Sequence, residues 1–183
     1  MPIVAPSVWN AARRFCEHLN EVLATTVTQT RLVPVRSRAR EILIEITFRQ
    51  AGHPIKASLA TRFGPLRLYL GQVCDSISRH DGRVQLRTIR YKYTLAARDE
   101  DDPIFRSEYG PTLSGFYSRH HLQGAVPLQI GRHALSLNDL HLPTGYVAVE
   151  EVLRFCIADL GVRPRSGDWN QILLDSSLTT GSA

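Results

Sequence analysis

Apolar residues near both ends of the chain recur at three- and four-residue steps, the spacing of an amphipathic helix. Ser7 can cap the first of these helices with its hydroxyl group. A second periodic segment spans residues 149–160 and is closed by Gly161, and a third follows Asp168. The pattern therefore predicts one N-terminal helix and two C-terminal helices. The apolar positions of the first helix are Trp9, Ala12, Phe15, Cys16, Leu19, Val22 and Leu23.

Between the helices, apolar and polar residues alternate or form β-branched runs, which indicates strands. Breaks that contain Gly or Pro separate these runs, as in His80-Asp81-Gly82. Residues 110–142 are otherwise predicted to be irregular. Strands are predicted at residues 41–48, 55–63, 66–70, 83–96 and 103–109, with a short strand at 125–130 and a loop or edge strand at 31–40.

Strands that are grouped, and not interleaved with helices, predict an antiparallel sheet with helices on one face or at its end. The expected fold class is α+β, with about five or six strands, an N-terminal helix and two C-terminal helices. The chain has 183 residues, of which 43% are hydrophobic and 21% charged, a composition typical of a folded domain. We expect a single domain over residues 1–178 and a disordered Ser/Thr/Gly tail at 179–183.

The chain carries no apolar run of about 18 residues, the length that a membrane-spanning helix needs. Its N-terminus also lacks the basic and apolar stretches of a signal peptide. No membrane association and a cytoplasmic location are therefore expected. Cys16 and Cys156 fall within helical apolar patterns, where buried reduced thiols are expected, and Cys74 forms no Cys-x-x-Cys pair.

The formal net charge is +5, and of the 22 cationic residues only Lys56 and Lys92 are lysines. The planar fork of arginine suits bidentate contacts to phosphate or carboxylate, so this excess is compatible with RNA or with an acidic protein partner. A GC-rich coding sequence produces the same bias without a functional cause. Charge alone therefore decides neither the partner nor the oligomeric state.

The irregular segment is rich in histidine, with His120, His121, His133 and His141 close together. Imidazole titrates near neutral pH, so one histidine could take the proton of a ribose 2′-hydroxyl while a second group protonates the leaving oxygen. We assign His121 as the base and Glu108 or His120 as the acid. Because adjacent residues of an extended segment point to opposite faces, only one of His120 and His121 can share a site with a given neighbour.

Arg106 and Arg90 are candidates to hold the phosphate in such a reaction. Tyr91 and Tyr93 could stack on bases, although aromatic residues on one face of a strand more often belong to the core. The candidate nucleic-acid-binding residues are Arg87, Arg90, Tyr91, Lys92 and Tyr93.

Two other chemistries are considered for this region. The histidines, with Glu108 or Asp139, could bind zinc, but their spacing matches no established zinc signature. A serine hydrolase would need a Gly-x-Ser-x-Gly elbow, and Leu113-Ser114-Gly115 lacks the first glycine. The favoured site therefore uses no metal and no cofactor.

The stretch from Ile89 to about Phe155 resembles the TumE-type family of small bacterial toxins. The matching residues are Tyr91 and Tyr93, then Phe105-Arg106-Ser107-Glu108, then His120-His121, then Val149-Glu150-Glu151-Val152-Leu153. The resemblance implies an RNA-cutting toxin that is held inactive by a cognate antitoxin, with Arg106 and His121 in its site. Glu108 stands where the family leads us to expect Asp, and the N-terminal helix and hairpin are additions.

Two hypotheses follow. The first is a toxin-like ribonuclease that cleaves RNA by metal-independent acid/base chemistry. The alternative is a non-catalytic protein- or nucleic-acid-binding subunit of a bacterial defence or toxin-antitoxin assembly, whose Arg-rich segment 31–40 docks the partner.

Overall fold

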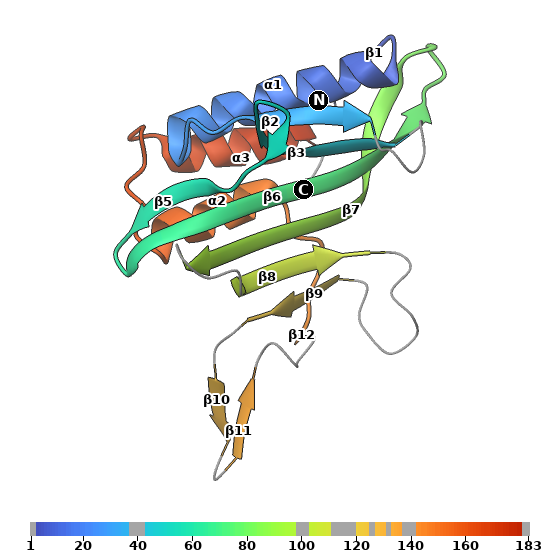
Figure 1. Ribbon diagram of the computed structural model, residues 1–183. Coiled ribbons are helices and arrows are strands. Elements are labelled where there is room, and N and C mark those ends of the chain that lie inside the picture. Colours follow the sequence, from blue (N-terminus) through green and yellow to red (C-terminus); the bar gives the residue numbers. More distant parts are fainter. Residues whose placement is uncertain are drawn as a thin grey trace.

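Within the residues that the computed structural model describes, three helices cover one face of a large antiparallel sheet (Figure 1). The structure describes residues 3–36, 43–97, 103–110, 120–124, 127–130, 133–136 and 142–180. Sheet and helices together confirm the α+β class and the predicted placement of one N-terminal and two C-terminal helices. The sheet has more strands than the five or six expected.

The helices begin and end close to their predicted positions: α1 spans Val8–Thr26, α2 spans Val149–Ala158 and α3 spans Trp169–Thr180. The Ser7 hydroxyl caps α1 as predicted, accepting a hydrogen bond from the backbone N–H of Asn10 at 3.2 Å. Helix α3 differs from the prediction because it continues through Thr179 and Thr180, where a disordered tail was expected. Residues 181–183 lie outside the described residues.

The main sheet follows the order β12-β9-β8-β7-β6-β3-β2, and every neighbouring pair is antiparallel. Its long central strands are β6 (Gly64–Ser78) and β7 (Val84–Ala97), so β6 runs well beyond the predicted residues 66–70. The other strands of this order are β2 (Leu32–Arg36), β3 (Ile44–Gln50), β8 (Pro103–Tyr109), β9 (His120–Gln123) and β12 (Leu142–Pro143).

Short strands account for the higher strand number. At the margins, β1 (Val4–Ala5) pairs with β7 and β4 (His53–Pro54) with β3, and neither was predicted. The strand predicted at residues 55–63 is β5 (Ala57–Thr61), which pairs with β6. β10 (Pro127–Ile130) and β11 (His133–Ser136) form a separate two-stranded sheet, so the segment predicted to be irregular contains several strands. Strands of two to four residues are too short for a period of two to be recognised in the sequence.

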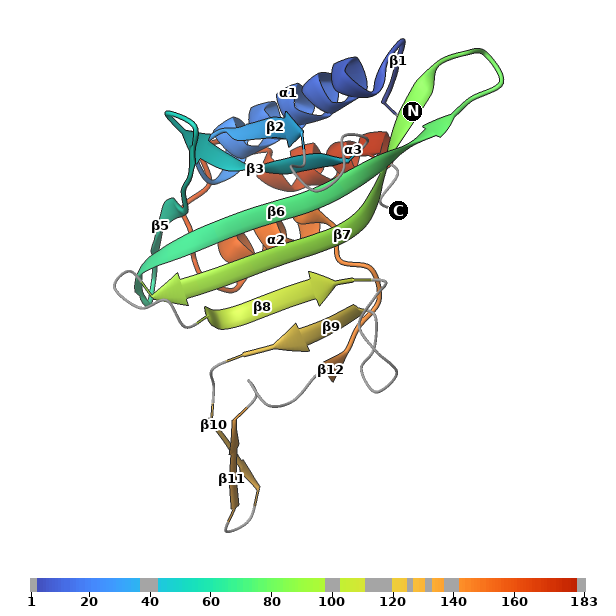
Figure 2. The same cartoon turned by 45° about the vertical axis from the view of Figure 1, so that its right-hand side comes forward.

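Alternate residues of the central strands form the core against the helices. Tyr91, Tyr93 and Leu95 of β7 all point to the helical layer and are at most 1% exposed. They pack in one cluster with apolar residues of all three helices, among them Leu19, Leu153 and Leu173. Because side chains alternate along a strand, the residues between them, such as Lys92 and Thr94, lie on the opposite face. The helices leave that face open (Figure 2).

No helix in the described part of the chain is long and apolar enough to span a membrane. The thiols of Cys16, Cys74 and Cys156 are free and buried, as the sequence predicts for Cys16 and Cys156. Burial raises the pKa of Cys74 and of Cys156 to about 12, so both thiols are protonated near neutral pH.

We expect the substitution Leu153→Ala to lower the free energy of unfolding by about 2–5 kcal/mol, because it leaves a cavity between α2 and the sheet. Leu153 is fully buried at the centre of the core. The matched control is Leu178→Ala, which removes the same atoms from a side chain that is 66% exposed and should change stability by less than about 0.5 kcal/mol. Urea unfolding followed by circular dichroism measures both values, and equal losses would contradict this assignment of the core.

Candidate functional site

The pairing of β7, β8 and β9 places three predicted site residues in one cross-strand row. Glu108 lies directly opposite Lys92 on one side and opposite His121 on the other. Arg106 lies two residues from Glu108 along β8 and therefore shares its face. We call Lys92, Arg106, Glu108 and His121 the Glu108 cluster.

All three basic side chains of the cluster contact the carboxylate of Glu108. Its Oε1 lies 3.1 Å from Nζ of Lys92 and 3.6 Å from Nε of Arg106, and its Oε2 lies 3.7 Å from Nε2 of His121. Arg106 also donates a hydrogen bond to the side-chain carbonyl of Gln123, its partner residue on β9. The structure thus brings together Arg106, Glu108 and His121, three of the four predicted catalytic residues.

The four side chains differ in how far solvent reaches them. Lys92 is 50% exposed, Arg106 and Glu108 are 24% and 23% exposed, and His121 is 2% exposed. A molecule on the open face can therefore contact the ammonium, guanidinium and carboxylate groups directly. His121 lies beside Glu108 on the neighbouring strand, where it can orient the carboxylate but is too buried to meet a substrate first.

A groove runs across the open face beside the cluster. One part, of about 490 Å³, is lined by Lys56, Tyr69, Lys92, Thr94, Ala96, Pro103 and Arg106. A second part, of about 640 Å³, shares Lys56 and Tyr69 and adds Gln50, Pro54, Ile55, Ser58 and Arg67. Among the described residues that line the two parts, four are cationic and none is acidic. The groove therefore favours an anionic occupant.

Tyr69 lies in the middle of this groove, above Gly71 of the same strand. A Cβ atom added to Gly71 would come within 2.7 Å of the Tyr69 hydroxyl oxygen, so only glycine leaves room for the ring in this position. Gly71 is paired with Lys92 across the strands, which brings the phenol to the row of the Glu108 cluster. Sequence reasoning missed Lys56, Arg67 and Tyr69 as site residues, although the alternation in residues 66–70 already placed Arg67 and Tyr69 on one face.

His120 is separated from the cluster because it follows the alternation to the helix-facing side. There its ring stacks on Tyr109 with centroids 4.1 Å apart, and its Nδ1 lies 3.1 Å from the hydroxyl oxygen of Tyr91. Burial lowers the pKa of His120, since its charged form loses hydration. The predicted role of His120 as the acid is therefore not supported by its position.

The predicted nucleic-acid-binding residues also divide between the faces. Tyr91 and Tyr93 stack on each other with ring centroids 4.7 Å apart. Both belong to the core, the role that the sequence offered as the alternative to base stacking. Arg90 and Lys92 are exposed on the open face. Arg87 lies beyond a bulge in the pairing of β6 and β7 and donates two hydrogen bonds to Asp75, at 3.0 and 2.5 Å.

Among the described residues, no three His, Cys, Asp or Glu side chains gather as a metal site. Asp139 and His141, which the zinc hypothesis used, lie outside the described residues, as do residues 37–40 of the Arg-rich segment. The first part of that segment forms the edge strand β2.

The fold and the groove thus define an α+β protein with a cationic open sheet face and a carboxylate cluster at one side of it. Comparison with protein-family models, with curated proteins and with solved structures finds no match to the chain.

We expect His120 to titrate below the ordinary histidine pKa of about 6.5. As the pH decreases, the unfolded chain then takes up a proton at His120 before the folded chain does. The free energy of unfolding therefore falls as the pH decreases from about 6.5 through the folded-state pKa of His120. Above that range His120 adds no pH dependence. An NMR titration measures the pKa, and unfolding at several pH values measures the stability.

His120→Phe should remove this part of the pH dependence while it keeps the ring on Tyr109. His80→Gln, at the exposed turn between β6 and β7, is the matched control for the loss of a histidine, and the part of the pH dependence assigned to His120 should persist in it. A His120 pKa above 6.5 would contradict the role of burial.

Proposed function

We propose that the protein binds single-stranded RNA along the open sheet face and cleaves it at the Glu108 cluster without a metal ion. The observation that carries the proposal is the contact of one accessible carboxylate with Lys92, Arg106 and His121 beside a groove in which the charged residues among the described lining are all cationic. Catalytic carboxylates of this kind are held by neighbouring charges and placed where substrate reaches them.

The chemistry is an attack of the ribose 2′-oxygen on the adjacent phosphorus. Glu108 accepts the 2′-hydroxyl proton, the O2′–P bond forms, and the P–O5′ bond breaks. Arg106 holds the phosphate oxygens, and the Lys92 ammonium donates a proton to the departing 5′-oxygen. This assignment moves the base from His121 to Glu108, because Glu108 is the more exposed of the two. His121 then positions the carboxylate.

An extended RNA strand suits the groove better than a single phosphate group. The two parts of the groove share Lys56 and Tyr69, so the cationic side chains are spread across several neighbouring strands. Cationic side chains placed along the path of a nucleic-acid backbone, with an aromatic ring between them, are typical of sites that bind a single strand. Arg67 would bind a phosphate in one part of the groove, Lys92 and Arg106 in the other, and Lys56, which lines both parts, between them.

A non-catalytic interaction module is the second candidate. It is favoured by the burial of His121 and by the three basic groups around Glu108, since an ion network of this form also occurs as a purely structural feature. In that case the same face would bind RNA or an acidic protein surface without cleaving it. A cognate antitoxin and a role in defence are the further proposals that accompany the TumE resemblance, and a cytoplasmic location is a separate proposal that rests on the N-terminal sequence.

We expect Glu108→Gln to slow the cleavage of a single-stranded RNA oligonucleotide by about 100-fold or more, because the substitution removes the proton acceptor and keeps the shape. Glu17→Gln is the matched control, since Glu17 is an exposed carboxylate on α1 that pairs with Arg13. Gel analysis of labelled RNA measures the rates, and EDTA should not change them.

Wild-type protein that leaves RNA intact but binds it would favour the interaction module. Cleavage at an unchanged rate by Glu108→Gln would exclude the proposed site.

We expect Tyr69→Ala to weaken the binding of single-stranded RNA by about 1–3 kcal/mol, the value of one aromatic stacking contact, whereas Tyr69→Phe should retain most of the affinity. Phe63→Ala is the control, because Phe63 is 68% exposed and lines neither part of the groove. Fluorescence anisotropy at several salt concentrations measures the affinity. Equal losses for Tyr69→Ala and Phe63→Ala would contradict the groove as the binding surface.

A further inference from the structure

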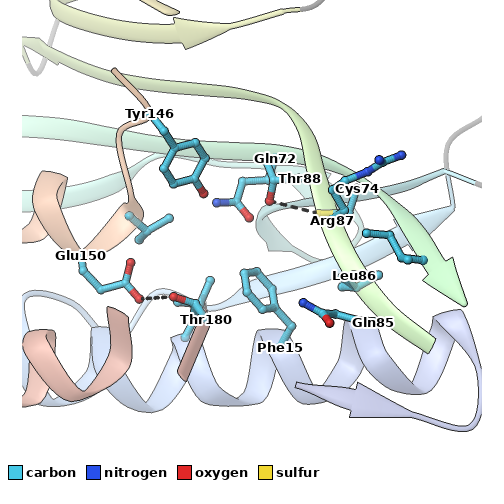
Figure 3. A pocket seen from close by; sticks show the side chains of 13 residues that line it. Phe15, Gln72, Cys74, Gln85, Leu86, Arg87, Thr88, Tyr146, Glu150 and Thr180 are labelled. Carbon is cyan, nitrogen blue, oxygen red and sulfur yellow. Dashed lines mark hydrogen bonds between the residues drawn. The ribbon is translucent and has the colours of Figure 1, made fainter. Parts of the chain in front are cut away.

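A separate cavity of about 220 Å³ lies on the helix-facing side of the sheet (Figure 3). It is partly open to solvent and is lined by residues of α1, of the central strands β6 and β7, and of the C-terminal helices. The groove of the proposed function lies on the other face, so the two regions do not share a surface. The cavity is lined by Phe15, Leu19, Gln72, Cys74, Ile77, Gln85, Leu86, Arg87, Thr88, Tyr146, Val149, Glu150 and Thr180.

Gln72 carries an unpartnered polar atom at this cavity. Its side chain is 5% exposed, and its Nε2 donates a hydrogen bond of 2.6 Å to the hydroxyl oxygen of Tyr93. Its carbonyl oxygen Oε1 has no hydrogen-bond partner. A buried acceptor in this state is unfavourable, because it has lost its hydrogen bond to water and gained none in the protein. A ligand that donates a hydrogen bond to Oε1 would recover that energy.

Glu150 supplies a buried carboxylate to the same cavity. It is 2% exposed, and its Oε1 accepts hydrogen bonds from the hydroxyls of Ser176 at 2.6 Å and Thr180 at 3.2 Å. The Ser176 oxygen also lies 3.0 Å from Nε2 of His18. Among the described residues, no cationic nitrogen lies within ion-pair distance of this carboxylate. A buried carboxylate held only by hydroxyls favours a cation that can reach it.

We propose that this cavity binds a compact planar cation with several N–H donors, an amidinium or guanidinium compound. Its charged head would donate to Glu150 and to Oε1 of Gln72, and its body would contact the aromatic rings of Phe15 and Tyr146. Figure 3 shows these four side chains around one space. A cavity of roughly 150 Å³ can hold benzene, so 220 Å³ accommodates one ring and a polar head.

The remaining charge at the cavity does not oppose such a ligand. Arg87 is the one cationic residue among the described lining residues, and its side chain is 57% exposed and paired with Asp75. Its charge is therefore neutralised at the surface, whereas the carboxylate of Glu150 lies inside.

The test uses benzamidinium chloride as the probe and the full-length protein. Two-dimensional NMR should show saturable shifts at Gln72, Thr88 and Phe15, and calorimetry should give an affinity that falls at least tenfold in Glu150→Gln. Glu151→Gln is the matched control, because Glu151 belongs to the same turn of α2 but bonds to the backbone N–H of Ala148 at 3.1 Å. Its affinity should equal that of the wild type.

Phe15→Trp provides a second variant that leaves the polar groups intact and fills part of the cavity, and it should also lower the affinity at least tenfold. Benzoate, with the same ring and the opposite charge, should bind at least tenfold more weakly than benzamidinium. The proposal is overturned if wild-type protein shows no saturable binding at millimolar benzamidinium. Unchanged affinity in Glu150→Gln, or equal binding of benzoate, overturns it as well.

Discussion

Packing of the central strands against the helical layer is the constraint on which the other features of the structure depend. Tyr91, Tyr93 and Leu95 are buried on one face of β7, and full burial of an aliphatic side chain such as that of Leu95 stabilises the fold by about 1.5–3 kcal/mol. Because side chains alternate along a strand, this burial forces Lys92 and Thr94 onto the opposite face. A shift of one residue would bury the charge of Lys92, so the core fixes where the cationic groove can lie.

The Glu108 cluster uses this fixed face to hold a carboxylate at moderate exposure. An ion pair at the surface contributes little to stability, roughly 0–1 kcal/mol, so the contacts of Glu108 with Lys92 and Arg106 are not needed for folding. Their effect is geometric, since three basic groups from three strands restrict one carboxylate to a single place. The buried ring of His121 makes that restriction stronger, because a side chain that is 2% exposed has little freedom to move.

The fold could be predicted well from the sequence, because the core residues recur with the local periodicity of helices and strands. The site depends instead on the register in which the strands pair. The alternation at residues 83–96 and the capped helices could be recognised directly. His120 and His121 are neighbours in the sequence, so their side chains were expected on opposite faces of an extended segment. Only the pairing of β8 with β9 decides that His121 lies opposite Glu108. β9 has four residues, too few for a periodic signal. The place of Lys56 and Tyr69 likewise depends on the hairpin of β5 and β6 and on Gly71.

Residues 71 and 72 of β6 mark the point along the strand between the two candidate binding regions. Leu66, Leu68 and Leu70 supply an unbroken apolar row to the core, but the next residue of that row is Gln72. Its amide is polar where the preceding side chains of the row are apolar, and its carbonyl oxygen has no hydrogen-bond partner, which is unfavourable in a dry contact. On the other face, Gly71 has no side chain, and any side chain at this position would displace the Tyr69 ring. The groove and the cavity therefore lie on opposite faces of the sheet and at successive positions along β6, the groove at Arg67 and Tyr69 and the cavity from Gln72 onward.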